Sequence, residues 1–241
     1  MTAVLVTVVM PAFNEAEFLT GSVDAIVAGL RATGAPFEVI VVENGSTDAT
    51  PVIADALPER LAEVRVIHRK EADYGRALRA GLLEARGDVV VNFDVDFFDL
   101  AFLETAVTRV RAPGGPAIVV GSKRAPGAHD SRSQLRKSAT WVFATLLRIA
   151  FGLTVSDTHG MKALRTADVR DLARACVSGT DLFDTELVLR TERAGAGVAE
   201  IPVTVIELRP ARSSFLSRVP RTLIGLCRLR IALAREQRRG R

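Results

Sequence analysis

Two acidic residues, Asp94 and Asp96, stand two positions apart after the mostly apolar run 89–93. In an extended chain this spacing places both carboxylates on one face, where they repel each other unless a cation lies beside them. Mg²⁺ takes few oxygen ligands from protein and completes its shell with water and substrate phosphates. The pair predicts a site for Mg²⁺ or Mn²⁺, and its place at a strand end favours this interpretation over a solvated acidic loop.

A second polar cluster, residues 43–50, joins an apolar run to a helical pattern. Gly45 permits a tight turn, and the start of the following helix favours anions. Glu43 and Asn44 offer oxygen acceptors to the N–H groups of a base, while Ser46 or Thr47 is expected to cap the helix. A capped helix start without a ligand is the alternative interpretation.

These clusters fall where strands are expected to end. Apolar runs predict strands at 4–11, 37–43, 64–68, 88–96 and 117–122, and helical spacing predicts helices at 15–33, 49–61 and 75–85, the last closed by Gly87. Such apolar strands are buried on both faces, which predicts an α/β fold with a mostly parallel sheet between helices. Ligands of these sheets bind beyond the carboxyl ends of the strands, so the polar clusters are expected to form one site.

The composition limits the class of protein. The chain has 241 residues and 48% hydrophobic content, which is enough for one core. Its net charge is +4, and arginines, which suit phosphate, are concentrated after Arg209. Aromatic residues make up only 5% and do not alternate with basic ones, so no nucleic-acid partner is expected. Cys176 and Cys227 match no zinc spacing.

Two segments bear on membranes. The longest apolar stretch, 139–155, is interrupted by Arg148 and is shorter than the ~20 residues of a spanning helix. The N-terminus has no signal-peptide pattern, so we expect a cytoplasmic protein. Apolar residues 141–149 and the basic tail predict peripheral attachment to the cytoplasmic face of a membrane; a helix packed on the core and a dimer helix are the alternatives.

On a helical wheel the tail divides into two sides. The basic side carries Arg218, Arg221, Arg228, Arg235 and Arg239, and the apolar side carries Leu216, Val219, Leu223, Leu226 and Cys227.

Three motifs, Val9–Glu15, Glu43–Thr50 and Asp94–Asp96, occur in the order and spacing of family-2 glycosyltransferases of the GT-A fold. Further on, Val155–Leu164 resembles the D-T-x-x-G-[FM]-K motif of the polyprenyl-phosphate branch, which includes dolichyl-phosphate mannose synthase and dolichyl-phosphate glucosyltransferase, and Phe183–Leu187 resembles the same branch. The resemblance covers about residues 4–210. It implies a GT-A (Rossmann-like nucleotide-diphospho-sugar transferase) domain at 1–210 and a basic amphipathic tail at 211–241.

The resemblance also implies roles for individual residues. A GDP- or UDP-sugar donor is expected to contact Pro11, Ala12, Asn14, Glu15, Glu43, Asn44, Ser46, Tyr74, Gly75 and Asp94, with Asp96 the better metal ligand. An acceptor phosphate is expected to contact Arg124, Arg132, Arg136, His159 and Lys162. Three segments depart from the family pattern. Glu43-Asn44 replaces the usual Asp-Asp, and Asp73–Ala77 replaces a glycine-rich loop. After the acidic pair, Phe97-Phe98 stands where the family usually has polar and proline residues.

The implied reaction inverts the anomeric carbon, and its acceptor decides what chemistry is needed. A polyprenyl phosphate is already ionised and needs no strong base, whereas a hydroxyl acceptor needs a base within hydrogen-bond reach. Asp184 and Glu186 are the candidate bases, unless they serve only as favourable charges at a helix start. The alternatives are a glycosyltransferase that acts on a soluble hydroxyl and a non-catalytic protein that binds a nucleotide sugar. A nucleotidyltransferase is not expected, because it would need a loop rich in glycine and lysine after the first strand, and residues 11–15 do not form such a loop. The sequence does not indicate which oligomeric state the protein adopts.

Overall fold

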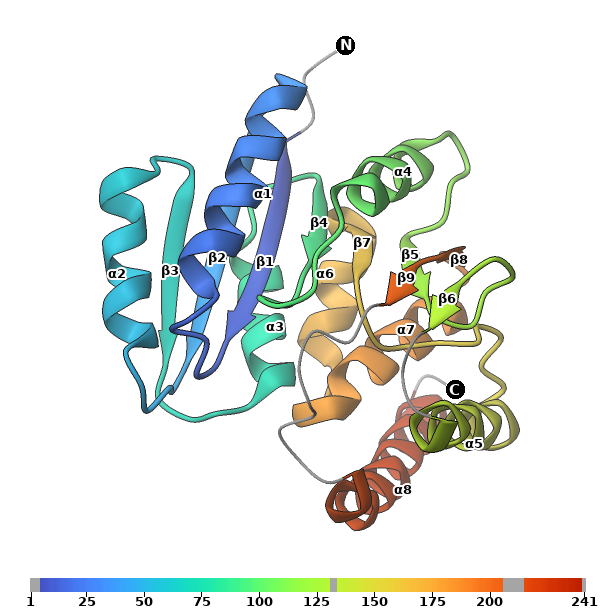
Figure 1. Cartoon of the computed structure of the whole chain (residues 1–241). Coiled ribbons are helices and arrows are strands. Elements are labelled where there is room, and N and C mark those ends of the chain that lie inside the picture. The colour runs from blue at the N-terminus through green and yellow to red at the C-terminus, as the bar shows by residue number, and fades with distance from the viewer. Residues whose placement is uncertain (1–4, 131–133, 206–214, 240–241) are drawn as a thin grey trace.

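The computed structural model describes residues 5–130, 134–205 and 215–239. Its main sheet has seven strands in the order β3-β2-β1-β4-β7-β5-β8, parallel except for β7 (Figure 1). The strands are β1 (Val6–Ala12), β2 (Phe37–Asn44), β3 (Val64–Arg69), β4 (Val89–Asn92), β5 (Ile118–Ser122), β7 (Lys162–Arg165) and β8 (Val198–Pro202). The strands β6 (His129–Asp130) and β9 (Thr204–Val205) form a small second sheet. The α/β architecture with a mostly parallel sheet is confirmed.

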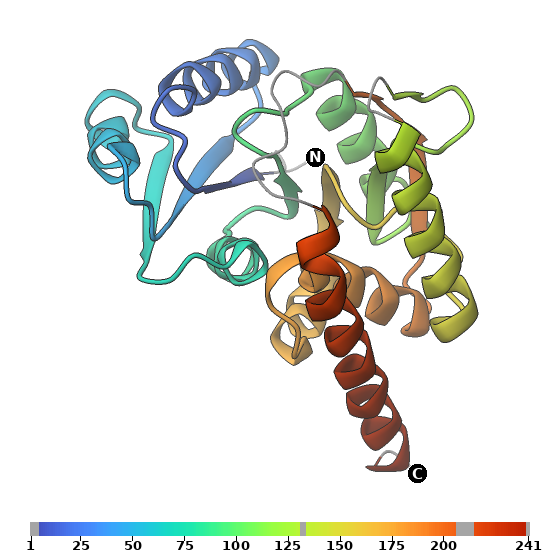
Figure 2. The same ribbon diagram turned by 60° about the horizontal axis from the view of Figure 1, so that its bottom comes forward.

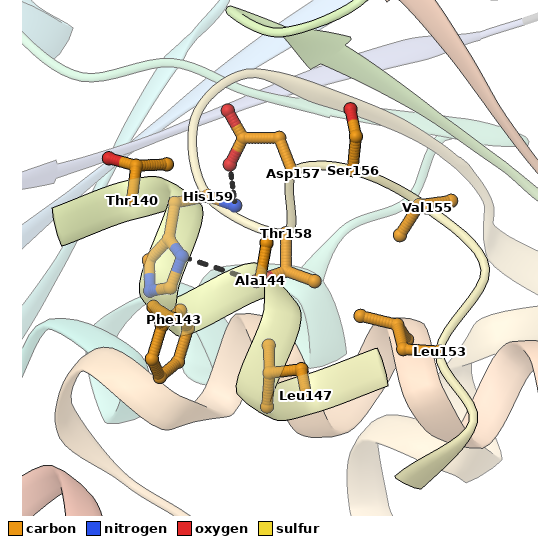
Figure 3. A pocket seen from close by; sticks show the side chains of 10 residues that line it. All are labelled: Thr140, Phe143, Ala144, Leu147, Leu153, Val155, Ser156, Asp157, Thr158 and His159. Carbon is orange, nitrogen blue, oxygen red and sulfur yellow. Dashed lines mark hydrogen bonds between the residues drawn. The ribbon is translucent and has the colours of Figure 1, made fainter. Parts of the chain in front are cut away.

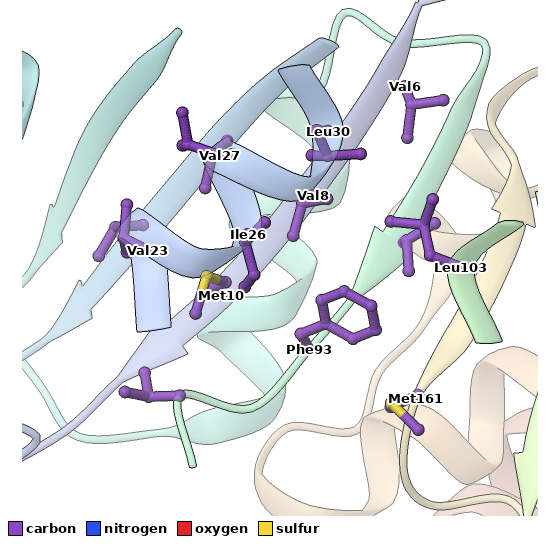
Figure 4. Close-up of a cluster of buried hydrophobic side chains, with 14 of the residues drawn as sticks. Val6, Val8, Met10, Val23, Ile26, Val27, Leu30, Phe93, Leu103 and Met161 are labelled. Carbon is purple, nitrogen blue, oxygen red and sulfur yellow. The ribbon is translucent and has the colours of Figure 1, made fainter. Parts of the chain in front are cut away.

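Helices cover both faces of the main sheet. They are α1 (Leu19–Thr33), α2 (Thr50–Arg60), α3 (Tyr74–Glu84), α4 (Leu100–Arg111), α5 (Gln134–Phe151), α6 (Thr166–Ala175), α7 (Phe183–Arg193) and α8 (Phe215–Arg239), with a 3₁₀ turn, η1 (Thr180–Leu182), before α7. In β1, side chains alternate: Val8 and Met10 enter one core and Val9 enters the other. The first core lies under α1, α2 and α4, and the second lies under α3 and α5 to α8. Figure 4 shows the part of the first core between α1, β1 and Leu103 of α4.

Two expectations about the ends of helices were wrong. Neither Ser46 nor Thr47 caps α2, because Asp48 accepts the Thr50 N–H at 2.9 Å and the other two side chains bond to Asn14. Gly87 does not close α3, which ends at an extended Ala85. Its role is close approach to β1, since a Cβ at Gly87 would lie 2.7 Å from the Thr7 nitrogen.

The strand expected at 88–96 is shorter, because β4 ends at Asn92. Asp94 and Phe97 form an isolated antiparallel bridge, with both of their N–H···O bonds at 3.2 Å. Phe97 and Phe98 pack against the first core, which draws the chain back after the acidic pair. The two carboxylates are therefore brought together by a tight turn and not by the alternation of an extended strand.

The tail helix α8 packs on the domain through Leu226, Leu229 and Leu233. The expected apolar side is therefore divided: Leu226 is buried, whereas Leu223 and Cys227 are exposed. The side chains of Leu216, Arg218, Val219 and Arg239 lie outside the described residues. Figure 2 shows α8 extending away from the sheet, and no helix within the described part of the chain is long and apolar enough to cross a bilayer.

Candidate active site

The polar clusters meet at one edge of the sheet. The parallel strands β1, β2 and β4 end there, with Ala12 beside Glu43 in the β1–β2 register. Strand β7 runs the other way, so its first residue, Lys162, lies beside Asn92 at the same edge. In Figure 1 this edge faces the end of the molecule where α5 and α8 lie.

Two loops at this edge are joined by hydrogen bonds. The Asn14 N–H donates to Ser46 Oγ at 3.0 Å, and Asn14 Oδ1 accepts the Thr47 N–H at 2.8 Å. The Glu15 N–H donates to Thr50 Oγ1 at 2.8 Å. Asn14 has a positive φ of 55°, which asparagine tolerates better than most residues. The predicted donor residues at 11–15 and 43–46 are thus brought into one structure, with Pro11 and Ala12 buried beneath it.

Glu43 and Asn44, at the end of β2, are buried. Glu43 accepts the Ser46 N–H at 2.7 Å and lies 3.4 Å from His68 Nδ1, whose other ring nitrogen lies 2.7 Å from Asp55. Burial opposes ionisation of Glu43, but the hydrogen bonds from Ser46 and His68 outweigh it and lower its pKa. The carboxylate is thus held in its charged form beside the turn.

The acidic pair forms the centre of the edge. Tyr74 donates its hydroxyl to Asp94 Oδ1 at 2.9 Å, and Ser22 Oγ bonds to the Val95 carbonyl at 2.6 Å, which fixes the turn. Burial raises the pKa of Asp94 above its ordinary value; the Tyr74 hydrogen bond opposes this rise, and the charges of Asp96 and Asp184 add to it. A cation beside Asp94 would favour its charged form.

A buried polar layer lies under the pair. Lys162 Nζ lies 3.0 Å from Asp184 Oδ1 and donates to the Gly160 carbonyl at 2.8 Å, while Asn92 Nδ2 donates to the same carbonyl at 3.2 Å. Asp184 Oδ1 is thus satisfied by the Lys162 ammonium, whereas Asn92 Oδ1 is buried and accepts no hydrogen bond. An unsatisfied buried acceptor is costly, so a ligand, water or ion that engages Asn92 Oδ1 would stabilise the site.

These observations fit a divalent ion with few protein ligands. The described residues hold no group of three or more His, Cys, Asp or Glu side chains arranged for a metal. Asp94 and Asp96 alone would leave most coordination positions to phosphate and water, which is how Mg²⁺ is usually held beside a diphosphate.

Two of the predicted acceptor residues, Arg124 and His159, lie on the α5 side. Arg124 Nη1 donates to the Thr140 carbonyl at 3.3 Å, which ties it to α5. The His159 N–H donates to Asp157 Oδ1 at 3.0 Å, and its ring meets that of Phe143 edge-on at 5.6 Å between centroids (Figure 3). His159 and Phe143 line a small cavity, together with three other residues of α5, with Leu153 and with residues 155–158. Arg132 and the side chain of Arg136 lie outside the described residues.

The two candidate bases have different surroundings. Glu186 is fully buried and accepts the Val177 and Ser178 N–H groups and Arg190 Nε, so its contacts are those of a structural carboxylate. The charge of Asp184 acts on Asp94 and helps to raise its pKa, but Asp184 is paired with Lys162. Lys162 itself is only 1% exposed, which suits the orientation of Asp184 better than capture of a phosphate from solution.

Two residues of the site were not predicted. Asn92 follows the three valines of β4 as the last residue of the strand, and an amide at a buried strand position was the available signal. The Lys123 ammonium lies 3.9 Å from Asp157 and about as far from the Cβ position of Gly160. Only its place beside Arg124 in the sequence pointed to it.

Comparison with known proteins now decides the family. The model of Glycosyl transferase family 2 matches residues 7–172, more than half of the chain. The chain belongs to glycosyltransferase family 2. The expected family and the expectation that the protein is an enzyme are both confirmed. This family-2 glycosyltransferase uses a nucleotide sugar.

Relatives of this family-2 glycosyltransferase include proteins of the lipid-phosphate branch. It is 30% identical over 209 residues to the undecaprenyl-phosphate mannosyltransferase of Micrococcus luteus, which covers 84% of each chain. It is 32% identical to dolichyl-phosphate beta-glucosyltransferase ALG5C of Trichomonas vaginalis, covering 83% of this chain and 63% of the relative. It is 35% identical to glycosyltransferase AglD of Haloferax volcanii, covering 82% of this chain but only 32% of AglD.

Solved structures share the fold of this glycosyltransferase at lower identity. The glucosyl-3-phosphoglycerate synthase of Mycobacterium tuberculosis in complex with UDP has a TM-score of 0.69 and 22% identity, covering 94% of this chain and 80% of that one. The mannosyl-3-phosphoglycerate synthase of Rubrobacter xylanophilus has a TM-score of 0.65 and 20% identity, covering 98% and 75%. These matches confirm the GT-A fold.

Proposed function

We propose that this glycosyltransferase transfers a sugar from a GDP- or UDP-sugar to a polyprenyl phosphate at a membrane surface, with inversion of the anomeric carbon. The observation that carries the proposal is the sheet edge where the Asp94–Asp96 turn follows Asn92, which is hydrogen-bonded to Gly160 at the end of the loop that lines the cavity beside α5. The relatives from Micrococcus luteus and Trichomonas vaginalis, whose names specify lipid-phosphate acceptors, support the choice of acceptor.

Asp94 and Asp96 would hold Mg²⁺ or Mn²⁺ against the donor diphosphate. When bound, the ion neutralises charge on the leaving nucleoside diphosphate. Structures of the mycobacterial synthase with Mn²⁺ and UDP, and with Mg²⁺ and UDP, support a divalent ion in this fold. Tyr74 keeps Asp94 in place through its hydroxyl, and the loops at 11–15 and 43–46 bind the nucleotide.

The acceptor phosphate would enter from the α5 side, where Lys123, Arg124 and His159 lie. A phosphate oxygen attacks as an anion, so no side chain has to remove a proton. This fits the surroundings of Asp184, which is buried and paired with Lys162. The alternative, a hydroxyl acceptor, draws on the fold likeness to the phosphoglycerate-linked synthases.

Exposed apolar side chains support a membrane surface. On α5, Trp141 and Val142 are each 58% exposed and Ile149 is 80% exposed. On α8, Leu223, Ile224 and Ile231 are about half exposed, and Arg221, Arg228 and Arg235 lie beside them. Arg230 of α8 donates to the Ala150 carbonyl at the end of α5, so the two helices meet. Apolar residues flanked by arginine suit the interface of an anionic bilayer.

The test is a transfer assay with radiolabelled UDP-glucose and GDP-mannose, MnCl₂, and undecaprenyl phosphate in detergent. We expect label from one donor to enter the organic phase, and Asp96→Asn to abolish the transfer. Label that stays in the aqueous phase on an added soluble acceptor would contradict the lipid acceptor. Donor binding without any turnover would favour the non-catalytic alternative.

A further inference from the structure

The turn before α7 is fastened to the start of α3. The Thr180 N–H donates to Asp73 Oδ1 at 2.6 Å, and the same oxygen accepts the Arg76 N–H at 2.9 Å as the N-cap of α3. Thr180 has a φ of 52°, in the left-handed region that β-branched residues rarely adopt. Strained backbone persists only where surrounding contacts over-determine it, and the Asp73 carboxylate supplies such a contact.

The two backbones also approach closely. A Cβ at Gly75 would lie 2.3 Å from the Thr180 carbonyl oxygen and 2.7 Å from Phe183 Cβ. A Cβ at Gly179 would lie 2.8 Å from Asp73 Oδ2. Since side chains at either glycine would push the turn away, the sequence 73–75 and the turn 179–183 act as one packed unit.

The start of α3 also contacts the donor side of the site. The Asp73 N–H donates to Asn44 Oδ1 at 3.1 Å, and Tyr74 donates to Asp94. Asp184 directly follows the fastened turn, as the second residue of α7. Asp73 thus contacts the base-side loop through its backbone and the α7 turn through its carboxylate.

We propose that Asp73 is a positioning residue, whose carboxylate fixes the placement of Asp184 beneath the acidic pair without touching substrate. The inference rests on the proposed function. Because the contact with Asn44 uses the backbone, loss of the carboxylate leaves the nucleotide side unchanged. Asp184 and its partner Lys162 act on Asp94 through their charges, so a shift of Asp184 disturbs the carboxylates that would hold the metal. We therefore expect loss of the Asp73 carboxylate to lower turnover and to spare donor affinity.

The informative variant is Asp73→Ser. Serine caps helices about as well as aspartate, so α3 keeps its cap, but the shorter neutral side chain does not hold the Thr180 N–H as well. Asp73→Asn retains an oxygen at the Oδ1 position. With the donor that the wild type uses, we expect Asp73→Ser to lower kcat about tenfold to a hundredfold, with donor KM within about threefold of wild type and recovery in Asp73→Asn.

Hydrogen exchange gives a readout that needs no activity. We expect the amides of 180–186 to exchange faster in Asp73→Ser than in wild type and Asp73→Asn. Leu30→Ala, which removes a core side chain of α1 far from the turn, is the control for lowered stability and should leave kcat and the exchange of 180–186 unchanged.

Wild-type kcat in Asp73→Ser, or unchanged exchange at 180–186, would overturn the inference. So would a rise in donor KM with kcat retained, because it would place Asp73 on the nucleotide side. If the wild type neither binds nor turns over UDP-glucose or GDP-mannose with MnCl₂, the proposed function fails, and the exchange experiment still decides whether Asp73 fastens the turn.

Discussion

At the scale of residues, the site depends on a buried ion pair. Lys162 and Asp184 are 1% and 5% exposed as side chains, and their charged atoms lie 3.0 Å apart. Neither charge reaches water, so each stabilises the other in place. The pair comes from segments that the sequence separates by 22 positions, and only the fold brings it under Asp94.

Removing one member of this pair should destabilise the protein strongly. We expect Lys162→Met to lower the free energy of unfolding by about 3–5 kcal/mol, because it leaves the Asp184 carboxylate buried without a partner. The double variant Lys162→Met/Asp184→Leu should recover part of that loss. Urea unfolding of the four proteins in the cycle measures the coupling, and additive losses would show that the pair does not interact.

At the scale of elements, α8 presents two different faces. Leu226, Leu229 and Leu233 pack on the second core, and Arg190 pairs with Glu236 at 2.8 Å. Ile224 and Ile231 on the opposite face are exposed, and so is Leu223 on the flank of the helix. The helical wheel predicted an apolar side, but it did not reveal which leucines the domain covers, because that depends on where η1 and α7 lie.

The exposed face of α8 can be tested separately from its packing. We expect Ile224→Glu/Ile231→Glu to abolish flotation with vesicles containing anionic phospholipid, because it places charge in the interface and removes apolar contact. Val52→Glu, at an exposed valine of α2, is the matched control and should float like wild type. Equal flotation of all three proteins, or of none, would contradict the membrane assignment of this face.

At the scale of the whole molecule, the sequence revealed the sheet and its functional edge. The valine-rich strands and the polar clusters after β1, β2 and β4 were readable because a buried parallel strand is continuously apolar. The sequence did not reveal β7, because residues Lys162–Arg165 show no strand pattern. They form a strand because β4 and β5 lie on either side of them and pair with them. The turn at Asp94–Phe97 was missed for a similar reason: it forms because Phe97 and Phe98 pack into a core assembled from distant segments.

The metal-binding role of Asp94 and Asp96 is tested by anomalous diffraction from crystals soaked with MnCl₂ and the nucleotide sugar that most raises the melting temperature. We expect a manganese peak between the diphosphate and the carboxylates of Asp94 and Asp96, with Tyr74 still bonded to Asp94. A nucleotide bound at this edge with manganese elsewhere, or with both carboxylates directed away from the diphosphate, would contradict it.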